Sequence, residues 1–174
     1  MKSTGVLRRI DDLGRIVIPK EIRKNLKIKN GESLEIFVNG DAVVLKKYSY
    51  MSDLRDVAQN CSDSFYDVLN NDIIITDLNN VIAASGPLKK KYYNKEISKV
   101  VTSMIKNRIP ILDDKTDELE IIKGIKEEGN FIVSPVLVSG DAVGAVIILS
   151  NSEITDLIEK TSNFIARFLG KHLQ

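Results

Sequence analysis

The sequence predicts an α+β protein built from a small β-rich module, residues 1–50, followed by a larger domain, residues 51–174. Two observations support this division. Near the N-terminus, two short β-branched runs flank a polar turn, which is typical of strands joined by a hairpin. Further along the chain, helical and strand periodicities alternate, and hairpins lie between two amphipathic helices. This order favours helices packed on an antiparallel sheet in the second part.

Composition narrows the class of protein. The chain has 174 residues, of which 43% are hydrophobic and 28% are charged, which suits a folded globular protein. Cys61 is the single cysteine, so no internal disulfide is possible and a reducing, cytoplasmic setting is expected. No apolar run approaches the roughly 20 residues that span a bilayer, and the N-terminus has no apolar signal segment. We therefore expect no membrane association.

The net charge of +1 hides an asymmetry between the two parts. Residues 1–47 carry eleven Lys and Arg against six Asp and Glu, a net charge of +5. Residues 48–174 carry fourteen against eighteen, a net charge of −4. A basic N-terminal part followed by a mildly acidic C-terminal part indicates a nucleic-acid-binding module joined to a domain of another kind.

The basic stretch Lys2–Lys24 is the most informative part of the chain. We predict strands over Val6–Ile10 and Ile16–Ile18, separated by the turn Asp11–Gly14. Pro19 ends the second run and opens a short helix. A second hairpin follows, because Asn39-Gly40 tolerates positive φ and lies between two apolar strands. The helix and the hairpin strands are expected over Lys20–Leu26, Leu34–Val38 and Ala42–Lys47.

A module this small has a poor core of its own. Below roughly 40–50 residues a lone domain usually needs disulfides, a metal or a partner chain. Residues 1–50 contain neither cysteine nor histidine. We therefore expect an obligate dimer whose strands pair between the two chains.

The second part is predicted to start with a helix over Asp53–Asn70, capped by Ser52, and to end with a long helix capped by Asn151 or Ser152. The two end helices are expected to pack together on one face of the sheet. Their apolar stripes are wider than one sheet contact requires, which leaves surface for a helical dimer interface. The segments expected between them are strands over Asp72–Thr76, Val81–Ala84, Ile109–Leu112, Leu119–Ile125, Phe131–Val138 and Val143–Leu149, and a helix over Lys95–Asn107.

The first 47 residues closely resemble the N-terminal module of the AbrB family of transition-state regulators. The resemblance implies a swapped-hairpin dimer with a looped-hinge helix that binds double-stranded DNA. The family's DNA-contacting arginines fall on Arg8, Arg15 and Arg23, and Arg9 is a further DNA-binding candidate beside Arg8. Lys24 departs from the arginine common in the family, and lysine keeps the charge but loses the bidentate fork. The matching residues are Lys2–Gly5, Arg8-Arg9, Asp12–Pro19, Glu21–Arg23, Leu34–Ile36 and Val44–Tyr48.

Arg15 follows the turn glycine, from where its side chain can reach into a DNA groove. Arginine there can read guanine or a narrow minor groove, whereas phosphate contacts carry no sequence information. The helix Lys20–Leu26 is too short to fill a major groove as a recognition helix. We therefore expect the protein to read DNA shape as much as base edges.

The second part resembles GAF domains, through Asp72–Ser85 and the hairpin Ser134–Val146. The order of the two parts resembles that of sporulation regulators that carry an AbrB-type module. This resemblance implies an activator and repressor of sporulation genes, acting on the nucleoid in the developing spore. It also implies a homotetramer held together by the GAF-side helices and by the swapped hairpins. A small unidentified ligand could lie between the sheet and its loops, and a purely structural role in dimerisation competes with this reading.

The sequence contains no nucleophile motif, metal-ligand cluster or glycine-rich phosphate loop, so we expect no enzyme activity, no metal and no cofactor. An antitoxin is the alternative function, because antitoxins also use swapped-hairpin modules. Antitoxins usually end in a disordered segment that wraps a toxin, whereas residues 53–174 are strongly periodic. Two smaller features have simple structural explanations. Cys61 is expected to be a buried small hydrophobic residue, and a redox sensor is the alternative. Lys89–Lys91 are expected to form a solvated turn, and contacts with flanking phosphates are the alternative.

Overall fold

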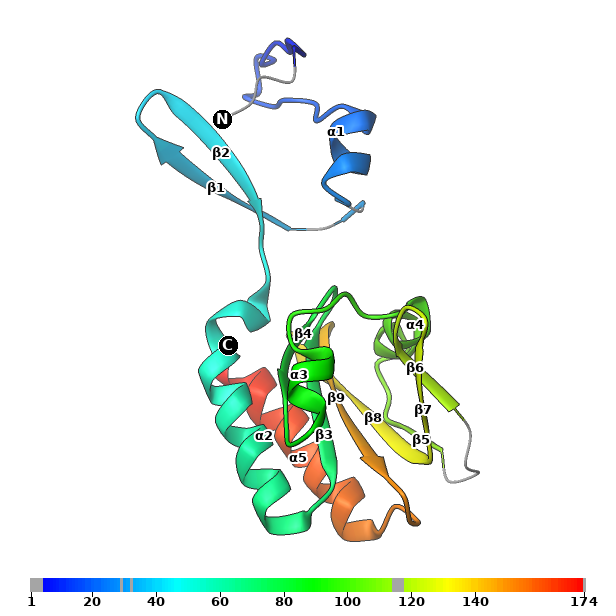
Figure 1. The fold of residues 1–174 in the computed structure, drawn as a ribbon. Helices are drawn as coiled ribbons and strands as arrows, with labels where there is room; N and C mark the ends of the chain where they lie inside the picture. The colour runs from blue at the N-terminus through cyan, green and yellow to red at the C-terminus, as the bar shows by residue number, and fades with distance from the viewer. Residues whose placement is uncertain (1–4, 29, 32, 114–117, 174) are drawn as a thin grey trace. The chain divides into compact units, whose positions relative to one another are not determined.

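The computed structural model describes residues 5–28, 30–31, 33–113 and 118–173. The chain divides into two compact units, Met1–Tyr48 and Ser49–Gln174. Figure 1 shows the elements of each unit. Residues 114–117, part of a polar segment in the sequence, lie outside the described residues.

The N-terminal unit consists of one helix and one hairpin. The helix α1 (Lys20–Asn25) follows Pro19, and the strands β1 (Leu34–Asn39) and β2 (Ala42–Lys47) pair antiparallel. Asn39 lies opposite Ala42, so Gly40 and Asp41 form the two-residue loop. Gly40 has a φ of +63°, a left-handed backbone that glycine adopts without strain. The predicted helix and hairpin are therefore present.

The two strands predicted over Val6–Ile10 and Ile16–Ile18 are not strands in this single chain. Only the turn between them forms, where the Gly14 amide donates to the Asp11 carbonyl at 2.9 Å and the Asp11 amide donates to the Arg15 carbonyl at 3.1 Å. A strand needs a neighbour along its length to satisfy its backbone groups. The prediction failed for one isolated chain because no described segment of that chain forms a ladder with these residues.

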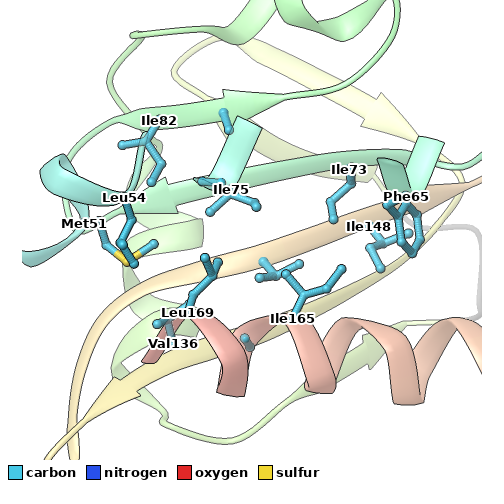
Figure 2. Close-up of a cluster of buried hydrophobic side chains, with 14 of the residues drawn as sticks. Met51, Leu54, Phe65, Ile73, Ile75, Ile82, Val136, Ile148, Ile165 and Leu169 are labelled. Carbon is cyan, nitrogen blue, oxygen red and sulfur yellow. The ribbon is translucent and has the colours of Figure 1, made fainter. Parts of the chain in front are cut away.

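The second unit is built on a five-stranded antiparallel sheet in the order β4-β3-β9-β8-β5. One face is covered by α2 (Arg55–Leu69) and α5 (Asp156–His172), as expected for the two end helices. Figure 2 shows the core on this face, where Phe65 of α2 and Ile165 and Leu169 of α5 are buried against isoleucines of the sheet. The strands of the sheet are β3 (Asp72–Asp77), β4 (Val81–Ala84), β5 (Ile111–Asp113), β8 (Asn130–Val138) and β9 (Asp141–Ser150).

The opposite face of the sheet is also covered, which corrects the expectation of helices on one face alone. This cover consists of α3 (Leu88–Tyr92), α4 (Lys99–Lys106) and the hairpin of β6 (Glu118–Ile122) and β7 (Ile125–Glu128). The reason lies in β3, where Ile73, Ile74 and Ile75 are all fully buried. Adjacent strand residues point to opposite faces, so a continuous apolar run needs cover on both.

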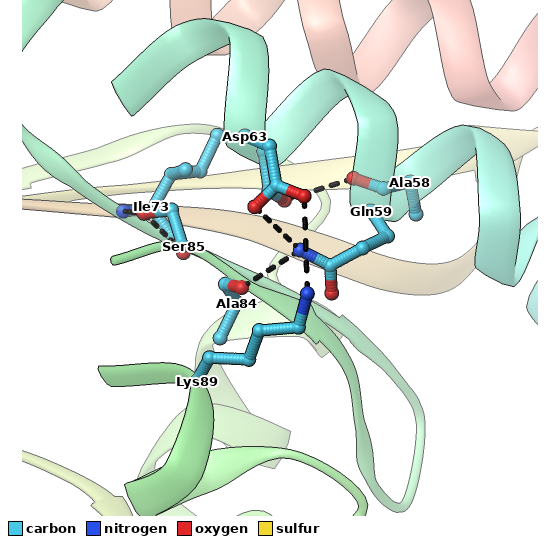
Figure 3. A network of polar contacts seen from close by, with 8 residues as sticks. Ala58, Gln59, Asp63, Ile73, Ala84, Ser85 and Lys89 are labelled. Atoms are coloured by element: carbon cyan, nitrogen blue, oxygen red, sulfur yellow. Dashed lines mark hydrogen bonds and ion pairs between the residues drawn. The ribbon is translucent and has the colours of Figure 1, made fainter. Parts of the chain in front are cut away.

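Polar contacts join the α2 helix to the sheet and to α3. Figure 3 shows the Gln59 side-chain amide donating to Asp63 Oδ1 at 2.8 Å and to the Ala84 carbonyl at 2.9 Å. Lys89 of α3 lies 3.8 Å from the other Asp63 oxygen. On the opposite face of the sheet, Tyr92 is fully buried and its hydroxyl donates to Glu127. Burial, and then this hydrogen bond to Glu127, raises the pKa of Tyr92. Lys91 pairs with the same Glu127 carboxylate.

The helix ends differ from the predicted ones in their capping residues. A 3₁₀ helix (Tyr50–Leu54) precedes α2, so Ser52 lies within it and Leu54 takes the cap position. The α5 helix is capped by Thr155, whose hydroxyl accepts from the Ile158 amide at 3.3 Å, rather than by Asn151 or Ser152. Across the described residues, no helix combines the length and the apolar character that a membrane crossing requires.

Candidate nucleic-acid interface

The Asp11–Arg15 loop is organised by one carboxylate. Asp11 Oδ1 accepts from the amides of Leu13 (3.0 Å) and Arg15 (2.8 Å), and Oδ2 pairs with Arg15 Nε at 2.8 Å. The Arg15 amide and then the Arg15 side chain hold the pKa of Asp11 below its usual value. Asp11 is therefore ionised at neutral pH and fixes the loop from which Arg15 emerges.

Arg15 itself remains largely exposed, at 71% of its side chain. Its Nε is bound to Asp11, and its two terminal nitrogens make no hydrogen bond to any described residue. Because Nε is held, the guanidinium is partly oriented before it meets a ligand. Two terminal N–H groups in a fixed plane can bind one base edge or one phosphate in a bidentate manner.

Arg8 and Arg9 lie on the chain that leads into this loop, and both are exposed. Arg8 makes a local hydrogen bond, from Nη1 to the carbonyl of Leu7 at 3.1 Å. Neither arginine belongs to a strand in the single chain. Both side chains are available to an anion.

Arg23 and Lys24 occupy the last turn of α1 but differ in their surroundings. Arg23 is half-buried, its Nη1 donates to Asn30 Oδ1 at 3.0 Å, and its Nε is buried with no hydrogen bond to a described residue. Lys24 is exposed. Arg23 thus links α1 to the turn that follows it through its hydrogen bond to Asn30, whereas the Lys24 side chain is exposed.

The N-terminal unit exposes most of its apolar side chains. Among the described residues from 5 to 48, only Pro19 is buried. Leu7 is 92% exposed, and exposed apolar residues recur in the loop segment, directly after α1 and on both strands. Exposed apolar patches of this extent are typical of interaction surfaces. The exposed set is Val6, Leu7, Ile10, Leu13, Ile16, Val17, Leu26, Ile36, Phe37, Val38, Val43, Leu45 and Tyr48.

Sequence reasoning missed two residues of this unit. Asp11 was assigned only to a turn, although an aspartate ahead of a glycine-containing turn is a known signal for binding backbone amides. Lys47 donates to the Lys27 carbonyl at 2.6 Å and so links the end of β2 to the turn that follows α1. No local pattern could have found that contact, since twenty residues separate its partners.

The other candidates of the sequence have mixed outcomes. Cys61 is only half-buried, and burial raises the pKa of its thiol. It faces an apolar groove between α2 and α5 rather than the closed core that was predicted. Lys89–Lys91 form most of the short helix α3, and two of the three have carboxylate partners. Within the described ranges, no three His, Cys, Asp or Glu residues gather as a metal site would require.

The fold of the second unit defines the class of protein. It is similar to the GAF domain of the Acinetobacter phosphoenolpyruvate-protein phosphotransferase, with a TM-score of 0.57 at 12% identity, over 74% of this chain and 84% of that one. Residues 53–174 match the family described as stage V sporulation protein T C-terminal, transcription factor. The predicted GAF-like domain is confirmed by these similarities.

Stage V sporulation protein T of Bacillus subtilis is 42% identical over 177 residues, which cover all of this chain and 99% of that protein. The chain therefore belongs to the stage V sporulation protein T family of transcription factors. Its N-terminal part is 52% identical over 48 residues to the transition state regulatory protein AbrB of the same organism, covering 28% of this chain and 50% of that protein. The AbrB-type module predicted from the sequence is confirmed. Residues 7–53 also match the family described as antidote-toxin recognition MazE, bacterial antitoxin.

Proposed function

We propose that this chain activates and represses sporulation genes by binding duplex DNA through its N-terminal module, residues 1–50. The observation that supports this most strongly is the oriented, exposed Arg15 on a loop fixed by Asp11. Arg15 reads base edges or groove width, and Arg8, Arg9 and Lys24 bind phosphates. Arg23 orients α1 and adds charge beside it. The chain acts on the nucleoid, in the cytoplasm of the developing spore, and performs no catalysis.

Two copies of the module form each DNA site. The unburied apolar residues and the unpaired strand segments of the single chain support this part of the proposal. Exchange of the segments 6–10 and 16–18 between two chains gives each a neighbouring strand and covers Leu7, Ile10 and Val17. It also doubles the number of cations facing the duplex.

The salt dependence of DNA binding tests the function. Each phosphate contact adds roughly 0.9 to the slope of log affinity against log salt on B-DNA. With Arg8, Arg9 and Lys24 from two chains, we expect a slope of about −5. Fluorescence anisotropy of a labelled duplex between low and moderate salt measures it. A flat dependence, or no duplex binding at low salt, contradicts the proposal.

The second unit, residues 51–174, joins DNA-bound dimers into tetramers and senses a small ligand. Support for assembly comes from an apolar groove of about 590 Å³ between α2 and α5. Val68 on α2 is 79% exposed there, and Leu157 and Phe164 on α5 are 60% and 66% exposed. Helices with wide exposed apolar stripes commonly pair with a second copy.

Val68→Glu is therefore expected to convert tetramers into dimers. A glutamate buried at the helix interface destabilises the tetramer by several kcal/mol, because its charge would have no partner there. In the isolated chain Val68 is exposed, so folding is expected to be unaffected. Light scattering after size exclusion measures the mass, and Asp67→Glu is a control on the same helix. A tetramer that persists in Val68→Glu would place the assembly surface elsewhere.

An antitoxin is the second candidate, favoured by the match of residues 7–53 to the MazE family. An antitoxin requires a toxin-binding segment beyond its DNA-binding module. Here the chain that follows the module forms a folded GAF-type domain with two covered sheet faces. The regulator is therefore the function we propose.

A further inference from the structure

A groove of about 1140 Å³ runs along the side of α5 in the second unit. Its floor is apolar, with Pro135 and Leu137 of β8, and Pro110 borders it just ahead of β5. Phe164 and Phe168 of α5 also line it. The order of the sheet explains the opening, because β5 pairs only with Phe131, Ile132 and Val133 of β8. Among the described residues, no strand pairs with the stretch of β8 beyond Val133 on that side.

Four cations line the same groove: Arg108, Lys160, Arg167 and Lys171. Arg108 pairs with Asp141 at 3.1 Å and Lys160 with Asp156 at 2.7 Å. Arg167 and Lys171 are exposed and have no carboxylate partner among the described residues. They are four residues apart on α5, so they lie on one side of the helix. The groove thus holds two cations that no described carboxylate of the chain neutralises.

Asn163 adds a fixed hydrogen-bond donor. Its Oδ1 accepts from Ser134 Oγ at 3.0 Å, and the buried Ser134 hydroxyl also accepts from Ser162 Oγ at 2.8 Å. This network holds the Asn163 carboxamide by its oxygen. The amide nitrogen has no hydrogen bond to any described residue, and Asn163 lines the groove. A neutral donor is therefore available beside the two cations.

We propose that this groove binds an amphipathic organic anion. A carboxylate, phosphate or sulfonate group binds Arg167 and Lys171 and accepts from Asn163, while an apolar body lies on Leu137, Pro135 and Phe164. Small-molecule sites usually combine an apolar lining with a few placed polar groups in about 300–1,000 Å³, and this groove is slightly larger than that range. The inference rests on the proposed sensing function and gives it a site and a class of ligand.

The site is on a different face from the one expected by the sequence. Between the sheet and its loops, the space is filled by buried side chains that include Tyr92, Val101 and Ile105. The α5 groove also shares Phe164 and Phe168 with the α2–α5 groove. A bound anion therefore contacts rings that a second copy would cover, and a ligand that prefers one assembly over another shifts the balance between them.

Isothermal titration of the full chain with octanoate tests the site, with octan-1-ol as the uncharged probe of equal length. We expect saturable octanoate binding that the double variant Arg167→Gln, Lys171→Gln weakens about tenfold or more, since charge-assisted hydrogen bonds are the strong ones. The matched control is Lys99→Gln, Lys123→Gln, which removes the same charge from exposed positions of the same unit. The control is expected to bind octanoate within about twofold of the parent chain.

Three results would overturn the inference: no saturable octanoate binding to the parent chain, octan-1-ol bound as tightly as octanoate, or equal loss in both double variants. The slope of log affinity for duplex DNA against log salt is measured for each sample as well. A sample that binds DNA but not octanoate contradicts the site alone, and one that binds octanoate but not DNA contradicts the proposed function alone. Circular dichroism confirms that each variant is folded, and all four substitutions are of exposed side chains.

Discussion

Arg15→Ala is expected to weaken duplex binding about 100-fold. Each good bidentate arginine contact is worth about 1–3 kcal/mol of discrimination, and a site made by two chains loses two such contacts. The side chain is 71% exposed and buries nothing, so the folded state is expected to persist. Fluorescence anisotropy on a sporulation-promoter duplex and on a scrambled duplex gives the affinity and the specificity together.

Arg15→Lys distinguishes the bidentate hydrogen bonding of the guanidinium from its positive charge. The lysine variant is expected to keep the salt slope but to lose preference for the promoter duplex, because a point charge cannot make a planar bidentate contact. Lys46→Ala, an exposed cation on β2, is the matched control for loss of charge. Promoter binding of parental strength by Arg15→Ala would remove Arg15 from the interface.

Gly144→Ala is expected to destabilise the second unit by about 3 kcal/mol or more. A Cβ at Gly144 would lie far inside van der Waals contact with the Thr76 carbonyl on the neighbouring strand. That atom belongs to the backbone of a central strand, so β3 and β9 would have to separate. Overpacking of this kind typically costs about 1–3 kcal/mol, and more where the backbone must move. Thermal unfolding should show a transition lowered by roughly 10 °C.

Gly124→Ala is the control for this steric effect. Gly124 has a φ of +78°, and a Cβ there would meet nothing within 4 Å. Its substitution therefore carries only the strain of a left-handed backbone, about 1 kcal/mol. Equal loss of stability in Gly124→Ala and Gly144→Ala would show that contact with Thr76 is not the cause.

The ends of the elements show where sequence reasoning was limited. The β1–β2 hairpin follows directly from Asn39-Gly40 between apolar runs, and it is present. The cap of α2 was misplaced because a 3₁₀ helix precedes the α-helix and puts Leu54 at the cap position. The cap of α5 was misplaced because Asn151, Ser152 and Thr155 all lie near its start. Thr155 rather than Ser152 caps α5, since Ser150 and Ser152 hydrogen-bond each other at the end of β9 instead.

The candidate DNA site could be predicted in its charges but not in its geometry. The positions of Arg8, Arg9, Arg15 and Lys24 follow from a short basic stretch, and all four are exposed. Arg23 was expected to be equivalent to them. Its burial against Asn30 depends on how the chain turns after α1, which no local pattern specifies.

The second covered face of the sheet could have been predicted from the Ile73–Ile75 run, because only a strand buried on both sides is apolar throughout.

The central claim is that two copies of the N-terminal module make one DNA site. Native mass spectrometry of the full chain on a short duplex tests it directly, over protein concentrations from well below to well above the duplex affinity. Complexes with two or four chains per duplex are expected, and none with one. A complex of one chain per duplex, formed with the affinity of the assembled protein, would show that a single module is a complete DNA site.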